Sequence, residues 1–445
     1  MMNNKHFTYR DIWKISYPII IGLVAQNIML VIDTAFLGRV SEITLGAAAI
    51  GGVFYLTVVM LATGFSVGTQ IMIGRRNGEG RYHAIGNVFD LAQGVLVTMA
   101  IVVWVLLHFA APPLLERIIS SPAILEESLV FLNFRKYGLL FGFVVLGFNA
   151  LYIGNTKTMV LSLSTFVMAF FNIVLDYLLI FGNYGFPEMG IAGAALATNI
   201  AELFTFLFYI SWAYFNSDYK KFLLFQRFLP DRKLLRTLLN LSVPVMFQYF
   251  FSFSAWFVFF LIIEQIGETA LAASNITRSI YMVLMIPVWG LSASVNTLVS
   301  NTIGRNQHDR VIPLILRVLL AGIVINILLV QVLIFFPDPI IRFYTDSQSL
   351  TEATKPLLRV IAFALIAFSA GMILFNGLSG TGKTMLALKL EILSIIFYLL
   401  TTLILALGFK APAHVVWTVE IVYFSVMGLL AFIALKKANW REINI

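Results

Sequence analysis

The chain has 445 residues, of which 60% are hydrophobic and 12% are charged. A soluble globular domain carries about 25% charged residues, so this composition excludes a soluble fold and predicts an integral membrane protein. The formal net charge is +8, but the basic residues cluster between apolar stretches, as in cytoplasmic loops, and nucleic-acid binding is not indicated. The sequence contains no cysteine, which excludes disulfides and thiolate metal sites.

Twelve apolar stretches are each long enough to cross a hydrocarbon core of about 30 Å as a helix. In chain order they lie near 13–37, 46–74, 84–111, 131–153, 159–182, 190–213, 236–264, 270–300, 311–336, 356–380, 385–408 and 413–436. We therefore predict an all-α integral membrane protein with twelve transmembrane helices. Residues 1–213 are predicted to form one six-helix lobe, 214–235 a cytoplasmic linker, and 236–445 a second six-helix lobe with a short cytoplasmic tail. The first stretch is too long for the h-region of a signal peptide.

The loops between these stretches alternate in charge. Basic residues gather before the first stretch, after the second, in the central linker and at the carboxyl end, for example Arg10, Arg76, Lys220 and Lys437. The intervening loops carry acidic residues, namely Glu116, Glu126, Glu127, Glu188, Glu264 and Glu268. Because cytoplasmic loops are enriched in Lys and Arg, both termini are predicted to be cytoplasmic.

The chain matches itself at a constant offset of 226 residues. Residues that recur at this offset include Pro18 as Pro244, Tyr55 as Tyr281, Gly64 as Gly290, and Lys157, Thr158 and Met159 as Lys383, Thr384 and Met385. A register held over this length indicates two copies of one structural unit. Because each copy contains an even number of helices, both enter the membrane in the same sense. This predicts a pseudo-twofold axis along the membrane normal, as in transporters that work by alternating access.

Ionisable side chains inside the apolar stretches are the candidate functional residues, since each is costly in hydrocarbon. Asp33 lies in the first stretch and Asp176 in the fifth, where Asn172 precedes it by one helical turn on the same face. The positions offset by 226 residues hold Phe259, Tyr398 and Thr402. The acidic site is therefore predicted in the amino-terminal half alone. The alternative is that these carboxylates only pair with a lysine or arginine in the packed interior.

Other polar residues and motifs in the sequence are weaker candidates for a functional site. Glu202 in the sixth stretch and Glu391 in the eleventh are weaker candidates, because neither has an obvious polar companion at helical spacing. The five histidines are scattered, so a metal site is not indicated. Residues 377–384 fit the Walker A expression, but they end a membrane stretch instead of following a buried strand, so nucleotide binding is not indicated. No combination of nucleophile, base and metal ligands points to an enzyme.

Three segments together resemble one transporter family. They are Asp-Thr-Ala-Phe-Leu-Gly at 33–38, Asn-Ile-Val-Leu-Asp-Tyr-Leu-Leu-Ile-Phe-Gly at 172–182 and Gly-Ile-Ala-Gly-Ala-Ala-Leu-Ala-Thr at 190–198. The chain resembles the multidrug and toxic compound extrusion (MATE) transporters over essentially its whole length. Within that family it is similar to the DinF-like branch. The NorM-like branch carries a glutamate eight residues after the proline of the seventh helix, whereas this chain has Ser252 there.

The resemblance implies the function as well as the fold. It implies a V-shaped pair of six-helix bundles in the inner membrane of a bacterium, exporting amphipathic, often cationic compounds in exchange for protons or sodium. The coupling cation would bind at Asp33, Asn172 and Asp176. Thr198 is implied as a cavity residue by its motif, and Tyr137 and Asn149 by approximate position. No cofactor is implied beyond the coupling ion.

Physical chemistry is consistent with that reading. Two carboxyl groups buried together repel each other and favour sharing a proton, which makes the proton the first choice of coupling ion. Sodium is the alternative, since carboxylate, amide and hydroxyl oxygens are ligands that a hard cation prefers. Pro18 is a predicted bending point of the first helix, because proline removes a backbone donor.

Two rival functions remain open. A lipid-linked oligosaccharide flippase of the same superfamily would present several basic residues to bind pyrophosphate, and Arg135, Arg278 and Arg359 are the arginines near the interiors of the stretches. An ion channel would need a selectivity filter around a pore, and no such repeat is found. We expect small amphipathic molecules and membrane lipids as partners, no nucleic acid, and a monomeric protein.

Overall fold

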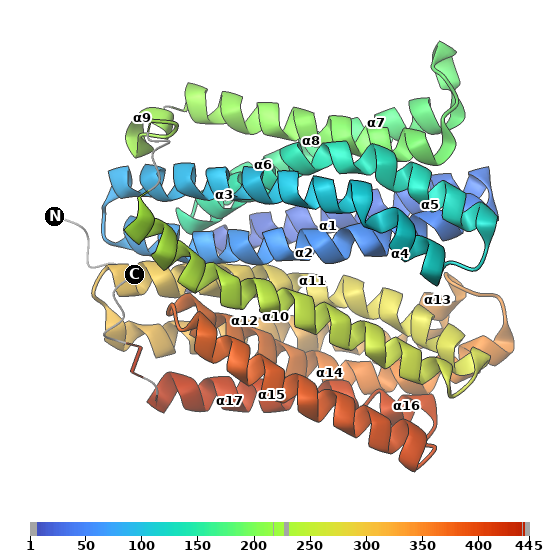
Figure 1. Cartoon of the computed structure of the whole chain (residues 1–445). Coiled ribbons are helices and arrows are strands. Elements are labelled where there is room, and N and C mark those ends of the chain that lie inside the picture. The colour runs from blue at the N-terminus through green and yellow to red at the C-terminus, as the bar shows by residue number, and fades with distance from the viewer. Residues whose placement is uncertain (1–6, 217, 227–230, 438, 441–445) are drawn as a thin grey trace. The chain divides into compact units, whose positions relative to one another are not determined.

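The computed structural model describes residues 7–216, 218–226, 231–437 and 439–440, and every regular element within them is a helix (Figure 1). Twelve helical segments are long and apolar enough to cross a membrane. The predicted all-α fold with twelve membrane-spanning helices is therefore confirmed. The two ends of the chain, 1–6 and 441–445, lie outside the described residues, so cytoplasmic termini remain a prediction.

The spans and the short helices between them follow in chain order. The first six spans are α1 (Tyr9–Val40), α2 (Glu42–Gly78), α3 (Tyr82–Phe109), α5 (Pro122–Arg135) with η1 (Lys136–Gly138) and α6 (Leu139–Gly154), α7 (Met159–Phe181), and α8 (Gly190–Phe215). The last six are α10 (Arg232–Glu264), α11 (Glu268–Gly304), η3 (His308–Arg310) with α12 (Val311–Phe335), α14 (Gln348–Gly380), α15 (Thr384–Leu403) with η4 (Ile404–Gly408), and α16 (Ala413–Val416) with α17 (Val419–Lys437). Shorter helices outside the spans are α4 (Ala111–Ile118), η2 (Asn183–Gly185), α9 (Asp218–Phe222) and α13 (Pro337–Arg342).

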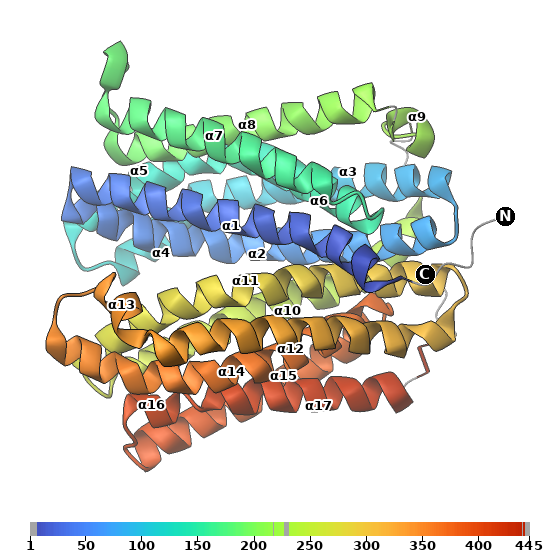
Figure 2. The ribbon, with the colours of Figure 1, turned by 180° about the vertical axis from the view of Figure 1, so that it is seen from behind.

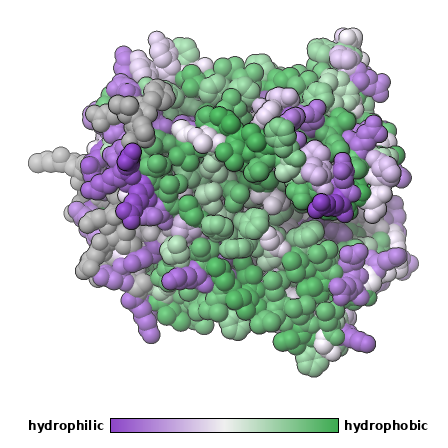
Figure 3. Space-filling model, viewed as in Figure 1, coloured by the Kyte–Doolittle hydropathy of each residue, from purple (hydrophilic) through white to green (hydrophobic). Residues whose placement is uncertain are grey.

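Local chemistry explains where several helices begin and end. Ser41 has extended backbone angles and accepts a hydrogen bond from the Thr44 amide at 3.0 Å, which is the usual N-cap of a helix. Gly182 ends α7 with φ of 67°, a left-handed conformation that glycine adopts at low cost. Hydrophobic side chains cover the middle of the helices, and hydrophilic side chains gather toward the ends (Figure 3). This distribution is the one that a bilayer requires.

The sequence repeat is also a repeat of helices. α2 and α11 are both 37 residues long. Their first residues, Glu42 and Glu268, are 226 positions apart, and so are their last residues, Gly78 and Gly304. Each half also begins with a long helix that contains a proline, Pro18 in α1 and Pro244 in α10. Figure 2 shows the helices from the opposite side.

Contacts divide the chain into two compact units. Ile21–Met246 form one, which we call the amino unit, and Met1–Ile20 with Phe247–Ile445 form the other, the carboxyl unit. Both dividing points lie inside helices, two residues after Pro18 and after Pro244, at repeat-equivalent positions. Ile12 and Ile15 of α1 accordingly belong to the hydrophobic core of the carboxyl unit.

The predicted lobes 1–213 and 236–445 follow the covalent repeat, whereas the contacts assign the first turns of α1 and α10 to the other half's helices. The predicted linker 214–235 contains α9, and its residues 217 and 227–230 lie outside the described residues.

Candidate functional site

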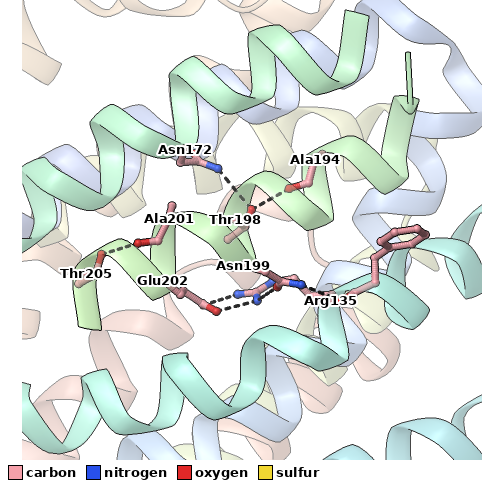
Figure 4. Close-up of polar contacts among 9 residues, drawn as sticks. Arg135, Asn172, Ala194, Thr198, Asn199, Ala201, Glu202 and Thr205 are labelled. Carbon is pink, nitrogen blue, oxygen red and sulfur yellow. Dashed lines mark hydrogen bonds and ion pairs between the residues drawn. The ribbon is translucent and has the colours of Figure 1, made fainter. Parts of the chain in front are cut away.

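Three of the predicted site residues meet within the amino unit. Asn172 and Asp176 project from α7 one helical turn apart, and both side chains are fully buried. Asn172 Nδ2 donates to Thr198 Oγ1 on α8 at 3.3 Å, and Thr198 Oγ1 donates to the Ala194 carbonyl at 3.0 Å (Figure 4). Thr198, which the sequence assigned to a cavity, therefore lies directly against Asn172.

The carboxyl groups of Asp33 and Asp176 neighbour each other across α1 and α7. Among the described residues, no N–H or O–H group donates a hydrogen bond to Asp33 Oδ1, to either carboxyl oxygen of Asp176 or to Asn172 Oδ1. Two carboxyl groups can hydrogen-bond to each other only when one of them carries a proton. A buried carboxylate without donor or counter-ion is costly, so these oxygens suit a proton or a small cation.

The donor set is limited to oxygen. Asp33, Asp176 and Asn172 offer carboxylate and amide oxygens, which are ligands for a hard cation such as sodium. In the described parts of the chain, no group of three or more His, Cys, Asp or Glu side chains is placed to hold a metal ion.

A buried ion pair lies beside these residues, and sequence reasoning did not find it. Arg135, at the end of α5, binds Glu202 of α8 through two hydrogen bonds of 2.9 Å and 2.5 Å (Figure 4). Arg135 also donates to Asn199 Oδ1 at 2.7 Å, and its guanidinium lies 4.4 Å from the Tyr55 ring centroid. Gly138 leaves the space for this cluster, because a Cβ there would lie 2.3 Å from Arg135 Nη1.

The Arg135–Glu202 pair helps to distinguish the two interpretations of the intramembrane carboxylates, a functional acidic site or a structural ion pair. Glu202 fits the alternative in which a buried carboxylate only pairs with a lysine or arginine. Its partner Arg135 comes from another helix, which is why the sequence shows no companion for Glu202 at helical spacing. Asp33 and Asp176 form no ion pair within 4.0 Å among the described residues, although Arg135 attracts Asp33 over a longer distance. The two aspartates thus lack the arginine partner that Glu202 has.

The other predicted residues lie elsewhere. Asn149 on α6 accepts a hydrogen bond from the Tyr209 hydroxyl at 2.6 Å, and Tyr209 accepts one from Ser164 at 2.7 Å. Tyr137 in η1 is 59% exposed, with its ring centroid 6.2 Å from that of Trp104. Their cavity role remains a prediction.

The carboxyl unit also contains buried carboxyl groups. Glu391 on α15 and Glu420 on α17 are each only 3% exposed. The sequence offered Glu391 as a weaker candidate, and Glu420 was not singled out; neither has an acidic counterpart at the offset of 226 residues. Glu420 lies within the twelfth predicted stretch, so the cost of a charge in hydrocarbon was a sufficient signal to find it.

Twelve spanning helices, a two-fold internal repeat and buried carboxyl groups within the spans define a multi-pass membrane protein built from two related halves. The sequence model of the MatE family matches residues 18–178 and 244–404, two segments related by the repeat offset, and the chain belongs to this family.

Curated relatives cover most of the chain. A probable multidrug resistance protein NorM of Thermotoga maritima is 25% identical over 87% of this chain and 83% of its own length. A probable NorM of Shewanella oneidensis is 23% identical over 100% of this chain and 98% of its own. The multidrug resistance protein PmpM of Pseudomonas aeruginosa is 27% identical over 66% of this chain and 62% of its own.

Solved structures share the fold. A MOP superfamily transporter from Pyrococcus furiosus superposes with a TM-score of 0.89 at 20% identity, covering 96% of this chain and 97% of that one. The Vibrio cholerae MATE transporter VcmN in its bent form gives a TM-score of 0.87 at 17% identity, with 96% of each chain covered.

Proposed function

We propose that the chain is a proton-coupled antiporter that exports amphipathic, often cationic small molecules, with a DinF-like coupling site at Asp33, Asn172 and Asp176. The observation that carries the proposal is the neighbouring pair of carboxyl groups of Asp33 and Asp176. Their oxygens Asp33 Oδ1, Asp176 Oδ1 and Asp176 Oδ2 are buried and receive no hydrogen bond from the described residues. The curated relatives named as multidrug resistance proteins support the substrate class.

Coupling follows from the charge of this site. A deprotonated Asp33–Asp176 pair favours a nearby organic cation, and a proton removes that preference. The two ligands then weaken each other's binding reciprocally, as linkage requires. Alternating access converts this competition into exchange: a proton taken up from outside displaces the compound, and deprotonation on the inside restores affinity for it. Pro18 is the proposed bending point of α1, and it stands two residues before the division between the units.

Sodium is the second candidate ion, because the site presents carboxylate and amide oxygens. A flippase is less well supported. Arg135 is held by Glu202, and Arg278 stacks on the Phe260 ring at 5.0 Å, so each of these two arginines already has a partner within its own unit.

The proposed setting is the inner membrane of a bacterium, with both termini cytoplasmic and the protein acting as a monomer. The spanning helices and the bacterial relatives support the membrane assignment. The charge of the loops supports the orientation.

The test is transport of a fluorescent cationic dye in proteoliposomes under separately imposed proton and sodium gradients. Wild type is compared with Asp33→Asn and Asp176→Asn, and with Asp346→Asn as the matched control, because Asp346 is exposed in the loop before α14. We expect a proton gradient alone to drive export, both site variants to lose it, and the control to retain it. Export driven by sodium alone would refute the ion assignment, and normal coupling in both site variants would refute the site.

A further inference from the structure

The carboxyl unit contains a polar cluster that the proposed coupling site does not include. Glu391 lies in the interior of the eleventh span and Glu420 in the interior of the twelfth, and α15 and α17 pack against each other. Both side chains are 3% exposed. We call Ser252, Tyr281, Glu391, Tyr398, Glu420 and Tyr423 the carboxyl cluster.

The two helices exchange hydrogen bonds reciprocally. Tyr423 of α17 donates to Glu391 Oε1 of α15 at 2.6 Å, and Tyr398 of α15 donates to Glu420 Oε1 of α17 at 2.9 Å. The rings of the two tyrosines lie 5.2 Å apart, centroid to centroid. Each glutamate is therefore held by a tyrosine of the other helix, and the two pairs contact each other through their tyrosine rings.

The Ser252 hydroxyl lies between the Glu391 carboxyl group and a backbone carbonyl oxygen of its own helix. Ser252 Oγ lies 2.5 Å from Glu391 Oε1 and 2.8 Å from the Gln248 carbonyl oxygen. A serine hydroxyl has a single hydrogen to donate, so it cannot satisfy both oxygens. If Glu391 is protonated, its carboxyl group donates to Ser252 while Ser252 donates to the Gln248 carbonyl, and both short contacts are then hydrogen bonds.

Two further atoms point to the same cluster. Glu391 Oε2 is buried and receives no hydrogen bond from the described residues, and the same holds for Thr277 Oγ1 on α11. Thr277 lies between Ser274, which accepts from Trp417 Nε1 at 2.9 Å, and Tyr281, which contacts Glu420 Oε2 at 3.5 Å. Its fully buried side chain thus lies on the face of α11 that contacts the twelfth span.

Among the described residues, no cation forms an ion pair with these carboxyl groups. The groups that face them are Ser252 from α10, Tyr281 from α11, Tyr398 from α15 and Tyr423 from α17, all of which are hydroxyls. The ion pairs found among the described residues of this unit involve Lys355 with Asp338 and Glu352, not the cluster. An uncompensated carboxylate in hydrocarbon is costly, and protonation is the usual way to remove that cost.

We propose that the carboxyl cluster is a second proton-binding site, with Glu391 as the residue that carries the proton and Glu420 as its linked partner. The ligand is a proton, since the groups that face the two carboxyl groups are hydroxyls, and no group of three or more His, Cys, Asp or Glu side chains among the described residues is placed to hold a metal ion. This inference does not depend on the Asp33–Asp176 site.

Infrared spectroscopy of the purified full-length protein in lipid tests the proposal, because the C=O stretch of a protonated carboxyl group is distinct from the bands of a carboxylate. We compare wild type with Glu391→Gln, Glu420→Gln and the control Glu264→Gln, a residue exposed at the end of α10. We expect the protonated-carboxyl band to lose one component in Glu391→Gln, to change in Glu420→Gln and to be unchanged in the control. A band unaffected by Glu391→Gln refutes the proposal.

Two further measurements keep the test decisive. If Glu391→Gln does not fold, Tyr423→Phe retains the glutamate and removes one hydrogen bond to its carboxyl group, so the same component should shift in frequency; an unmoved band refutes the proposal. Loss of the component on adding sodium at constant pH would show that the site holds sodium instead, which also refutes it. Because the readout needs no transport, failure of the Asp33–Asp176 proposal leaves this result unaffected.

Discussion

Gly64 and Gly290 occupy equivalent positions in the two repeats and make equivalent helix contacts. A Cβ on Gly64 would lie 2.5 Å from Met246 Cα in α10, and a Cβ on Gly290 would lie 2.4 Å from Ile20 Cγ1 in α1. Met246 and Ile20 are themselves separated by the repeat offset and are the last residues before the two division points. Each glycine therefore allows the first turns of a helix from the other half of the sequence to pack closely against its own helix.

Gly64→Ala should destabilise the protein, because the clash is with helix backbone that cannot rotate away. Overpacking of this kind costs about 1 to 3 kcal/mol, and it should lower the thermal midpoint measured by fluorescence-detected size exclusion. Gly52→Ala is the matched control: it lies in the same helix with no atom within 4 Å of its Cβ position. That control should be neutral or stabilising. Equal midpoints for the two variants would contradict the close approach.

Glu202→Gln should destabilise the amino unit strongly, because it leaves the buried Arg135 guanidinium without a counter-ion. Removing one partner of a buried pair costs about 3 to 5 kcal/mol. The double variant Arg135→Met, Glu202→Met should recover much of that loss, since it removes both charges. Thermal midpoints of the single and double variants measure the effect. A single variant as stable as wild type would mean that Arg135 is adequately paired by other groups.

Thr198→Val should weaken binding of the coupling ion without unfolding the protein. The change keeps the side-chain shape but removes the acceptor for Asn172 Nδ2, and a lost hydrogen bond costs about 1 kcal/mol, or about fivefold in affinity. Thr198→Ser should restore the wild-type value. The measurement is the ion concentration at half-maximal dye export, and equal values for the valine and serine variants would count against the contact.

Asp90→Ala should release the first part of the central linker. The two Asp90 carboxylate oxygens accept hydrogen bonds from the amides of Phe225 and Gln226 at 2.8 Å and 3.1 Å. Without them, trypsin should cut more rapidly at Lys220 and Lys221, which limited proteolysis followed by mass spectrometry would show. Asp90→Asn retains one carbonyl acceptor and should be intermediate. Unchanged cleavage in the alanine variant would show that other contacts hold the segment.

Much of the fold could be predicted because the bilayer makes long apolar helices the dominant solution. The twelve spans, the repeat offset and the spacing of Asn172 and Asp176 all follow from local patterns. The fourth span is an instructive departure: the apolar stretch 131–153 proved to be part of a longer helical segment, Pro122–Gly154, interrupted at η1. Hydropathy marks the hydrocarbon part of a helix and does not detect its polar extension.

The sequence by itself determined the membrane class, the number of spans, the two-fold repeat and the position of Asp33 and Asp176 within apolar stretches, because these depend on composition and on spacing along one helix. Only the tertiary structure decided which carboxyl groups are paired. Glu202 meets Arg135, Glu391 meets Tyr423, and Asp33 meets Asp176, each across two helices far apart in sequence. Side-chain partners of this kind depend on how helices pack in three dimensions, and helical periodicity within one segment carries no information about them.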